Sequence, residues 1–164
     1  INFEIREAKK NNKAELIVKV NSLTDQRAID LLYRASNAGV KIILIVRGVS
    51  RLIPGIKKQS ENISVLSTVG RFLEHHRVLY FYHAGFEHVY CSSADWMERN
   101  LSRRTEATFP ILDPKLKQRV IKEALKPHID SRHTYVLDKN LRYKMKNSKG
   151  RELHPNEIAI EEIH

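Results

Sequence analysis

A fully apolar strand pattern at residues 40–46, together with the amphipathic segment before it, limits the fold most strongly. The run Val-Lys-Ile-Ile-Leu-Ile-Val has almost no polar alternation, which is typical of a strand covered on both faces. An apolar stripe within residues 28–35 predicts a helix, and Gly39 stands where a left-handed C-terminal residue is favoured. With an apolar strand pattern at residues 14–20, these features predict a βαβ unit in a largely parallel sheet.

The rest of the chain continues the α/β order. A helix is expected at residues 1–12, and strands are expected at residues 63–66, 77–82, 88–93, 105–112 and 135–137. The turn between residues 82 and 88 is short enough to predict an antiparallel hairpin. Asp113 and Pro114 predict a capped helix that runs to about residue 126. The basic segment 142–151 is expected to be a mobile tail.

Length and cysteine content indicate one intracellular domain. The 164 residues can bury a real core, and Cys91 has no partner in the chain, so an internal disulfide is excluded. The sequence has no apolar stretch of membrane-spanning length and no signal-peptide pattern. We therefore expect a reducing, cytoplasmic location, with association with a membrane surface left open. Because the chain starts with Ile1 rather than Met, we expect a piece of a longer protein.

An excess of positive charge favours a polyanionic partner. The chain has 29 Lys and Arg against 19 Asp and Glu, a formal net charge of +10. Charge alone leaves nucleic acid, inorganic polyphosphate and anionic membrane open. No glycine-rich loop ends in Lys-Ser or Lys-Thr, so any ATP must be bound by arginine and histidine, with Mg²⁺ arriving on the nucleotide. His83 and His88 lack other residues at ligand spacing, so we expect no metal site.

The segment Glu74-His75-His76-Arg77 is the first candidate for chemistry. In an extended chain, His75 and Arg77 lie on one side and His76 on the other. A histidine beside an arginine could exchange a proton while the guanidinium holds phosphate oxygens. The alternative is a structural histidine that is hydrogen-bonded to Glu74.

Two further groups of polar residues follow strand patterns. Arg47 and Gly48 come directly after the strand at residues 40–46, at the edge where ligands of α/β sheets collect, although Arg47 could be an ordinary solvated residue. Ser93 and Asp95 follow another strand and could support a phosphate site, or simply form a turn and a helix cap. A basic cluster that includes Arg103 and Arg104 lies beyond them and would otherwise be a solvated face.

Several motifs in one order resemble the carboxy-terminal domain of polyphosphate kinase. The resemblance extends to about residue 127, so we divide the chain into a catalytic domain at residues 1–127 and a basic extension of that domain at residues 128–164. The motifs that carry it are Asn21-Ser22-Leu23-Thr24-Asp25, Gly39-Val40-Lys41, Leu44-Ile45-Val46-Arg47-Gly48, Ser60-Glu61-Asn62-Ile63, Gly70-Arg71-Phe72-Leu73-Glu74-His75, Ser92-Ser93-Ala94-Asp95-Trp96-Met97 and Asp113-Pro114.

The resemblance implies a phospholipase D-like α/β fold, a mixed and mainly parallel sheet flanked by helices. It also implies an enzyme that reversibly moves the terminal phosphate of ATP onto polyphosphate through a phosphohistidine in a preceding domain, which this chain lacks. His75 matches the family's second active-site histidine, which contacts ATP, and Arg47 matches its ATP-contacting arginine. The pattern of His75 and Arg77 followed by Ser93 and Asp95 is similar to a degenerate phospholipase D motif.

The same resemblance sets the remaining expectations. Arg47, His75 and Arg77 would bind ATP and its phosphates, while Arg103 and Arg104 would attract polyphosphate. His76 departs from the family pattern and could partly replace His75. The partners implied are ATP and ADP, polyphosphate, the other domains of the same polypeptide and further copies in a homo-oligomer, and the 164 residues alone are expected to be inactive.

Two other functions are left open by the residues. A phospholipase D-like phosphodiesterase or nuclease would use the same histidine geometry and would hydrolyse a diester without ATP. A non-catalytic polyanion-binding module would explain the charge but not Arg47 and His75 at strand ends. Nucleic acid is therefore not the expected partner.

Overall fold

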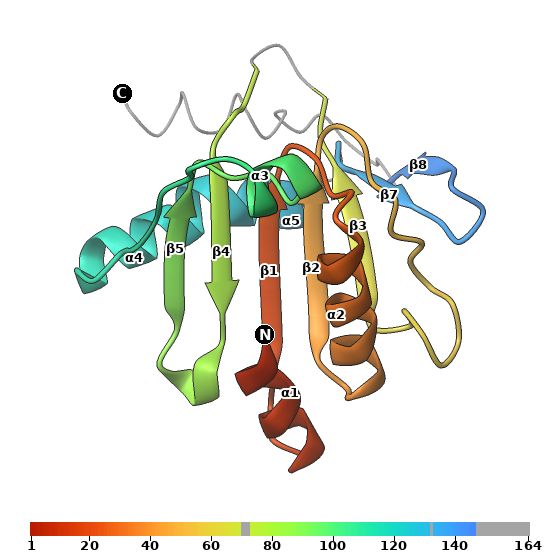
Figure 1. The fold of residues 1–164 in the computed structure, drawn as a ribbon, viewed down its shortest axis with the longest axis horizontal. Helices are drawn as coiled ribbons and strands as arrows, with labels where there is room; N and C mark the ends of the chain where they lie inside the picture. The colour runs from red at the N-terminus through yellow and green to blue at the C-terminus, as the bar shows by residue number, and fades with distance from the viewer. Residues whose placement is uncertain (70–72, 132, 147–164) are drawn as a thin grey trace.

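A mixed β-sheet with helices on both faces forms the framework of the molecule (Figure 1). The computed structural model describes residues 1–69, 73–131 and 133–146. Among these residues, eight strands lie in the order β6-β5-β4-β1-β2-β3-β7-β8. The strands are β1 Glu15–Val20, β2 Lys41–Val46, β3 Ile63–Ser67, β4 Arg77–Phe81, β5 His88–Ser92, β6 Thr108–Pro110, β7 Tyr135–Leu137 and β8 Tyr143–Met145. The helices are α1 Asn2–Lys9, α2 Gln26–Asn37, α3 Glu98–Ser102, α4 Pro114–Val120 and α5 Lys126–Asp130.

The predicted βαβ unit is present at the centre of the sheet. β1 pairs in parallel with β2, from Glu15 opposite Lys41 to Val20 opposite Val46, and β2 pairs in parallel with β3. The Asp25 side chain caps α2 by accepting a hydrogen bond from the Ala28 amide at 2.9 Å. Gly39 follows the helix with a φ of +94°, which is the left-handed conformation expected there.

The sheet is mixed, but five of the seven strand pairings among the described residues are antiparallel, so the prediction that it is mainly parallel is wrong beyond the βαβ unit. The antiparallel strands bring distant segments to one edge. β4 pairs antiparallel with β1 and with β5, so the predicted hairpin is confirmed. β4 therefore begins at the edge where β1 and β2 end, and β5 returns to that same edge. This topology places residues that follow β1, β2 and β5 near the residues that precede β4.

Two apolar layers cover the two faces of the sheet. α1 and α2 pack on the first face together with the buried Trp96, and α4 and α5 pack on the second, behind the sheet in Figure 1. In β1, Leu16 and Val18 belong to the first layer, whereas Ile17 belongs to the second. By the strand alternation, Lys19 lies on the second face.

The C-terminal part is more ordered than the sequence indicates. The helix predicted to end at about residue 126 continues through a π-helical turn, Ile121–Leu125, into α5, which also spans the suggested boundary between residues 127 and 128. The predicted mobile tail is wrong for residues 143–145, because they form β8 and pair with β7. Residues 147–151 of that prediction lie outside the described residues. No helix among the described residues is long and apolar enough to cross a bilayer.

Candidate functional site

Most of the polar residues singled out from the sequence gather at the edge of the sheet where β1 and β2 end. Asn21 directly follows β1, and Arg47 directly follows β2. Arg77 is the first residue of β4 and lies opposite Ser92, the last residue of β5. The strand topology thus collects these side chains from four separate parts of the sequence.

Asp95 is the centre of this edge. Its Oδ1 accepts hydrogen bonds from the backbone amides of Asn21 at 2.7 Å and Ser22 at 3.3 Å. Arg77 donates to both carboxylate oxygens, from Nε to Oδ1 at 3.2 Å and from Nη2 to Oδ2 at 3.0 Å. Burial alone would favour the neutral carboxyl, but the bonds from Arg77 and Asn21 lower the pKa of Asp95. The resulting two-point ion pair fixes the guanidinium plane.

Arg77 in turn holds His75. Its Nη1 donates to the backbone oxygen of His75 at 3.1 Å and lies 3.4 Å from Nδ1 of the imidazole. His75 and Arg77 therefore share one side of the chain, as the strand alternation predicts. The imidazole is exposed, whereas the Arg77 side chain is 13% exposed. An accessible histidine is thus supported by a largely enclosed arginine.

Arg47 joins the same group through Asn21. Its Nε donates to Oδ1 of Asn21, whose own amide group donates to Asp95 at 3.1 Å. A Cβ added to Gly48 would lie 2.7 Å from the Asn21 backbone oxygen, so this close approach requires glycine. Asn21 was not among the predicted site residues, although a polar residue directly after a buried strand is the signal that identified Arg47.

Ser93 and the basic cluster lie beside this group, with other partners. Ser93 Oγ donates to Glu106, and the residue that precedes α3 is Met97, which makes no side-chain cap. The helix-cap alternative for Ser93 and Asp95 is therefore wrong. Arg103 is exposed and binds the exposed Glu98 at 3.1 Å. Hydrogen bonds from Ser93 and Asn100, and then the charge of Arg104, lower the pKa of Glu106.

A second group of ionisable residues lies on the opposite face of the same segment. We use the name ionic cluster for Lys19, Glu74, His76 and His128. The Lys19 ammonium binds the Glu74 carboxylate and lies 2.7 Å from Nε2 of His76 and 2.5 Å from Nε2 of His128. This cluster could not be predicted from local patterns, because β1 and α5 supply two of its members and are far from residues 74–76 in the sequence.

The members of the ionic cluster perturb one another strongly. Burial lowers the pKa of Lys19 to about 8, against the opposing charge of Glu74. Burial opposes the ionisation of Glu74, but the hydrogen bond from His128 and the charge of Lys19 lower its pKa to about 2. Burial and then the Lys19 charge lower the pKa of His76 to about 4. At neutral pH the cluster therefore holds an ionised carboxylate and a neutral His76.

Three members of the cluster have the residue types of a metal site. Ligand atoms of Glu74, His76 and His128 lie within 4.8 Å of one another, which the sequence analysis did not foresee. The Lys19 ammonium, however, contacts all three ligand atoms itself. The protein's own cation thus takes the place that a metal ion would need.

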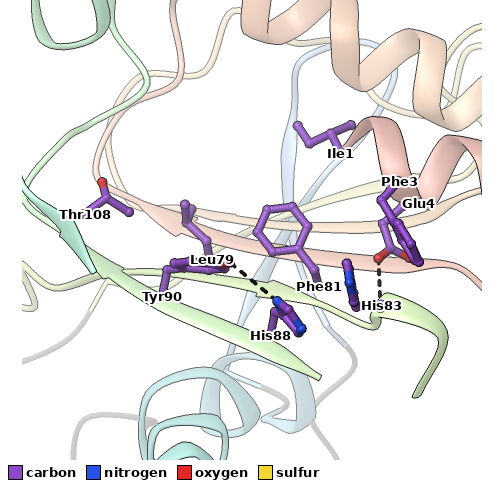
Figure 2. Close-up of a pocket in the computed structure, with 9 residues that line it drawn as sticks. All are labelled: Ile1, Phe3, Glu4, Leu79, Phe81, His83, His88, Tyr90 and Thr108. Carbon is purple, nitrogen blue, oxygen red and sulfur yellow. Dashed lines mark hydrogen bonds between the residues drawn. The ribbon is translucent and has the colours of Figure 1, made fainter. Parts of the chain in front are cut away.

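A separate hollow of about 350 Å³ lies on the first face, over β4 and β5 (Figure 2). Its aromatic lining includes His83, whose ring centroid is 3.9 Å from that of Phe3 and 3.9 Å from that of His88. Glu4 accepts a hydrogen bond from the His83 amide at 2.8 Å. None of the site residues predicted from the sequence lines this hollow.

Comparisons with known proteins agree on one family. A family model described as polyphosphate kinase C-terminal domain 2 matches residues 1–156. A polyphosphate kinase of Burkholderia multivorans is 57% identical over 125 residues, which is 76% of this chain and 18% of that protein. The crystal structure of polyphosphate kinase from Porphyromonas gingivalis has a TM-score of 0.93 and 36% identity, covering 99% of this chain and 25% of that one.

A more distant similarity concerns the fold. Nuc from Salmonella typhimurium, described as a phospholipase D family member, has a TM-score of 0.51 and 16% identity, covering 72% of this chain and 80% of that one. The predicted phospholipase D-like fold is thereby confirmed. The chain spans about a fifth of the length of the curated relatives it matches.

Proposed function

This chain belongs to the polyphosphate kinase family as its C-terminal domain 2, and on that premise we propose that it helps to transfer the terminal phosphate of ATP to inorganic polyphosphate. In the proposed reaction, a histidine of the preceding domain takes the γ-phosphate and ADP leaves with the bridging oxygen. The terminal oxygen of polyphosphate then takes the phosphate from that histidine. Both steps are reversible, and the chain acts as part of a longer polypeptide, since it spans about a fifth of the length of the curated relatives it matches.

The observation that carries this proposal is the linked group of Arg47, Asn21, Asp95, Arg77 and His75. It places an exposed imidazole and a guanidinium at one edge of the sheet, held by a buried ion pair. Phosphoryl transfer depends mainly on positioning and on neutralising charge, for which fixed cations are well suited. The group therefore matches the needs of this reaction.

His75 has the role of a proton carrier and hydrogen-bond donor. A guanidinium only donates, so Nδ1 of neutral His75 faces it as an acceptor and the ring proton is on Nε2. Nε2 is then the atom that donates to a phosphate oxygen of the transferring group. Arg77 keeps the ring in this orientation while it binds Asp95.

Arg47 has the role of a clamp on the phosphates of ATP. Its Nε is engaged by Asn21, which leaves the terminal nitrogens of the guanidinium to form a fork with phosphate oxygens. ATP brings Mg²⁺ with it, and the ion neutralises charge on the phosphates. We assign no residue of this chain as a ligand of that ion.

Arg103 and Arg104 have the role of attracting the polyphosphate chain. Arg103 and Arg104 are exposed at the end of α3, and the whole chain has a net charge of +10. Exposed cations act over distances set by ionic strength, so binding of polyphosphate should weaken steeply with added salt. Arg103→Ala with Arg104→Ala should raise the KM for polyphosphate and leave that for ATP nearly unchanged.

The test uses the longer polypeptide that contains this chain. Wild type, His75→Ala and Arg47→Ala are assayed for polyphosphate synthesis from ATP and for phosphohistidine by phosphate labelling. Loss of synthesis in both folded variants supports the proposed roles. An undiminished rate in both would remove this edge from the reaction, and hydrolysis of a model phosphodiester without ATP would favour the diesterase instead.

Three further expectations belong to the same proposal. Residues 128–164 extend the domain of residues 1–127, since β7 beyond that boundary pairs with β3. The location is cytoplasmic, in keeping with one unpaired cysteine, Cys91. The full polypeptide forms a homo-oligomer, which sedimentation of the longer protein would test.

A further inference from the structure

We propose that the ionic cluster of Lys19, Glu74, His76 and His128 is a positioning device that holds His75 in place from the opposite face of the sheet. This inference rests on the proposed function of His75 and assigns positioning roles to residues that do not touch the substrate. It is supported by the burial of Lys19, by the anchoring of two neighbours of His75 and by the alternation of side chains along residues 74–77.

Lys19 is the fixed point of the cluster. It projects from β1, the central strand between β4 and β2, and is only 5% exposed. Its ammonium contacts the Glu74 carboxylate and lies 2.7 Å from Nε2 of His76 and 2.5 Å from Nε2 of His128, so polar atoms of three side chains surround it. A buried charge is costly unless it is paired and hydrogen-bonded, so Lys19 strongly requires these partners.

His128 extends the cluster to the other end of the β3–β4 connection. Its Nε2 lies 2.9 Å from the Glu74 carboxylate, and its Nδ1 lies 3.0 Å from Oγ1 of Thr68, the residue directly after β3. Thr134 Oγ1 donates to the backbone oxygen of His128 at 2.7 Å. The connection is thus held at Thr68 on one side and at Glu74 and His76 on the other.

The geometry of residues 74–77 transmits this anchoring to His75. Glu74 and His76 face the ionic cluster, whereas His75 and Arg77 face Asp95. His75 therefore lies between two anchored neighbours, and Arg77 holds its backbone oxygen. Its ring is exposed although its backbone is restrained from both faces, which is the arrangement that a catalytic side chain on a loop needs.

A double-mutant cycle in the longer polypeptide tests the inference. Lys19→Met and Glu74→Gln are each combined with His75→Ala, and kcat and KM are measured for polyphosphate synthesis from ATP. Each single substitution should lower kcat by about 10- to 100-fold with KM for ATP nearly unchanged, because small displacements of catalytic groups are costly. In the His75→Ala background the same substitutions should lower kcat by less than about twofold, because they act through His75.

The matched control is Lys41→Met. Lys41 is exposed and forms a pair with Glu15 at 2.7 Å at the opposite edge of the same sheet, so the control removes a lysine–glutamate pair that lies away from His75. Lys41→Met should leave kcat unchanged. Should the single substitutions prevent folding, Lys19→Met with Glu74→Leu provides a second variant, because apolar replacement of a buried ion pair often preserves stability. That variant should also lose kcat only where His75 is present.

The outcomes separate this inference from the function on which it rests. If His75→Ala lowers kcat, and Lys19→Met lowers kcat by the same factor with and without His75, the positioning role alone would be overturned. A wild-type rate for His75→Ala would overturn the role of His75 and the inference with it. Faster amide exchange at residues 74–77 in Lys19→Met, with exchange at Asn21 unchanged, would show the anchoring directly, and unaltered exchange would contradict it.

Discussion

The two faces of residues 74–77 use charge in different ways. On one face Asp95 and Arg77 form an ion pair at 3.0 Å that leads outward to the exposed His75. On the other face the charges of Lys19 and Glu74 are enclosed with His76 and His128. Adjacent histidines therefore have unlike surroundings, and sequence adjacency does not make them equivalent. One face is arranged to meet a substrate and the other to hold the chain.

Removing each histidine in turn is the most direct test of the difference between the two faces. His75→Ala in the longer polypeptide should lower kcat for polyphosphate synthesis about a thousandfold, as expected for loss of a general acid or base. His76→Ala should lower it far less, because its imidazole contacts Lys19 on the other face. Steady-state rates of the two variants provide the measurement.

The double variant decides whether His76 can replace His75. Its ring would have to turn away from Lys19 and cross to the Asp95 face, so we expect no rescue. The kcat of the double variant, His75→Ala with His76→Ala, should then be no lower than the kcat of His75→Ala divided by the small factor that His76→Ala alone causes. A much slower double variant would show that His76 does act as a substitute and that the two faces are exchangeable.

The next prediction compares buried with exposed ion pairs. Lys19→Met should lower the free energy of unfolding by about 3 kcal/mol, because it leaves the half-buried Glu74 carboxylate without its main cation. Glu98→Gln breaks the Arg103 pair, whose side chains are 76% and 70% exposed, and should change the free energy by less than about 0.5 kcal/mol. Urea unfolding of the chain expressed alone, followed by Trp96 fluorescence, measures both. Equal changes in the free energy of unfolding for the two substitutions would contradict the expected difference between buried and exposed ion pairs.

Local sequence patterns predicted the face toward Asp95 better than the face toward Lys19. Apolar runs identified β1 and β2, and the two-residue period of an extended chain placed His75 and Arg77 together. Lys19 stands inside the apolar run of β1, where no local rule supplies a partner. Its burial depends on Glu74 and His128, which only the folded sheet brings to it.

The same limit explains the errors at the C-terminal end. Residues 142–146 read Arg-Tyr-Lys-Met-Lys, a short alternation in which three basic residues outweigh two apolar ones, so the charge favoured a tail over a strand. β8 forms because β7 offers it an unpaired edge, with Tyr135 opposite Met145 and Leu137 opposite Tyr143. Pairing with an existing strand therefore overrides weak local preference there.

A smaller effect is expected when a side chain is added at Gly48, which lies close to Asn21. In Gly48→Ala the new Cβ meets the Asn21 backbone oxygen, so Asn21 and the bound Arg47 must shift. We expect kcat/KM for ATP to fall about tenfold, with the free energy of unfolding lowered by about 1–2 kcal/mol.

Gly55→Ala is the matched control for this substitution. Gly55 has a φ of +72° and no atom near its added Cβ, so strain alone should cost about 1 kcal/mol of stability. Because Gly55 contacts none of the site residues, its kcat/KM should stay at the wild-type value. An equal loss of activity in both variants would mean that general destabilisation, rather than displacement of Arg47, lowers the rate.

The smallest expected effect is the pH dependence that His76 adds to stability. Its pKa of about 4 in the fold is below its ordinary value of 6.5, so unfolding takes up a proton between these pH values. The fold therefore loses stability as pH falls from 6.5 to 4, and the group has no further effect below 4. His76→Asn should flatten this slope by less than about 1.4 kcal/mol per pH unit, the limit for one proton, since its side chain is 42% exposed and partly screened. Glu74, with a pKa of about 2, acts in the same direction but at lower pH, from 4.5 downward, so urea unfolding between pH 5 and 7 isolates His76 from it. An unchanged slope would mean that neither burial nor the Lys19 charge lowers the pKa of His76, and the ionic cluster would then consist of Lys19, Glu74 and His128.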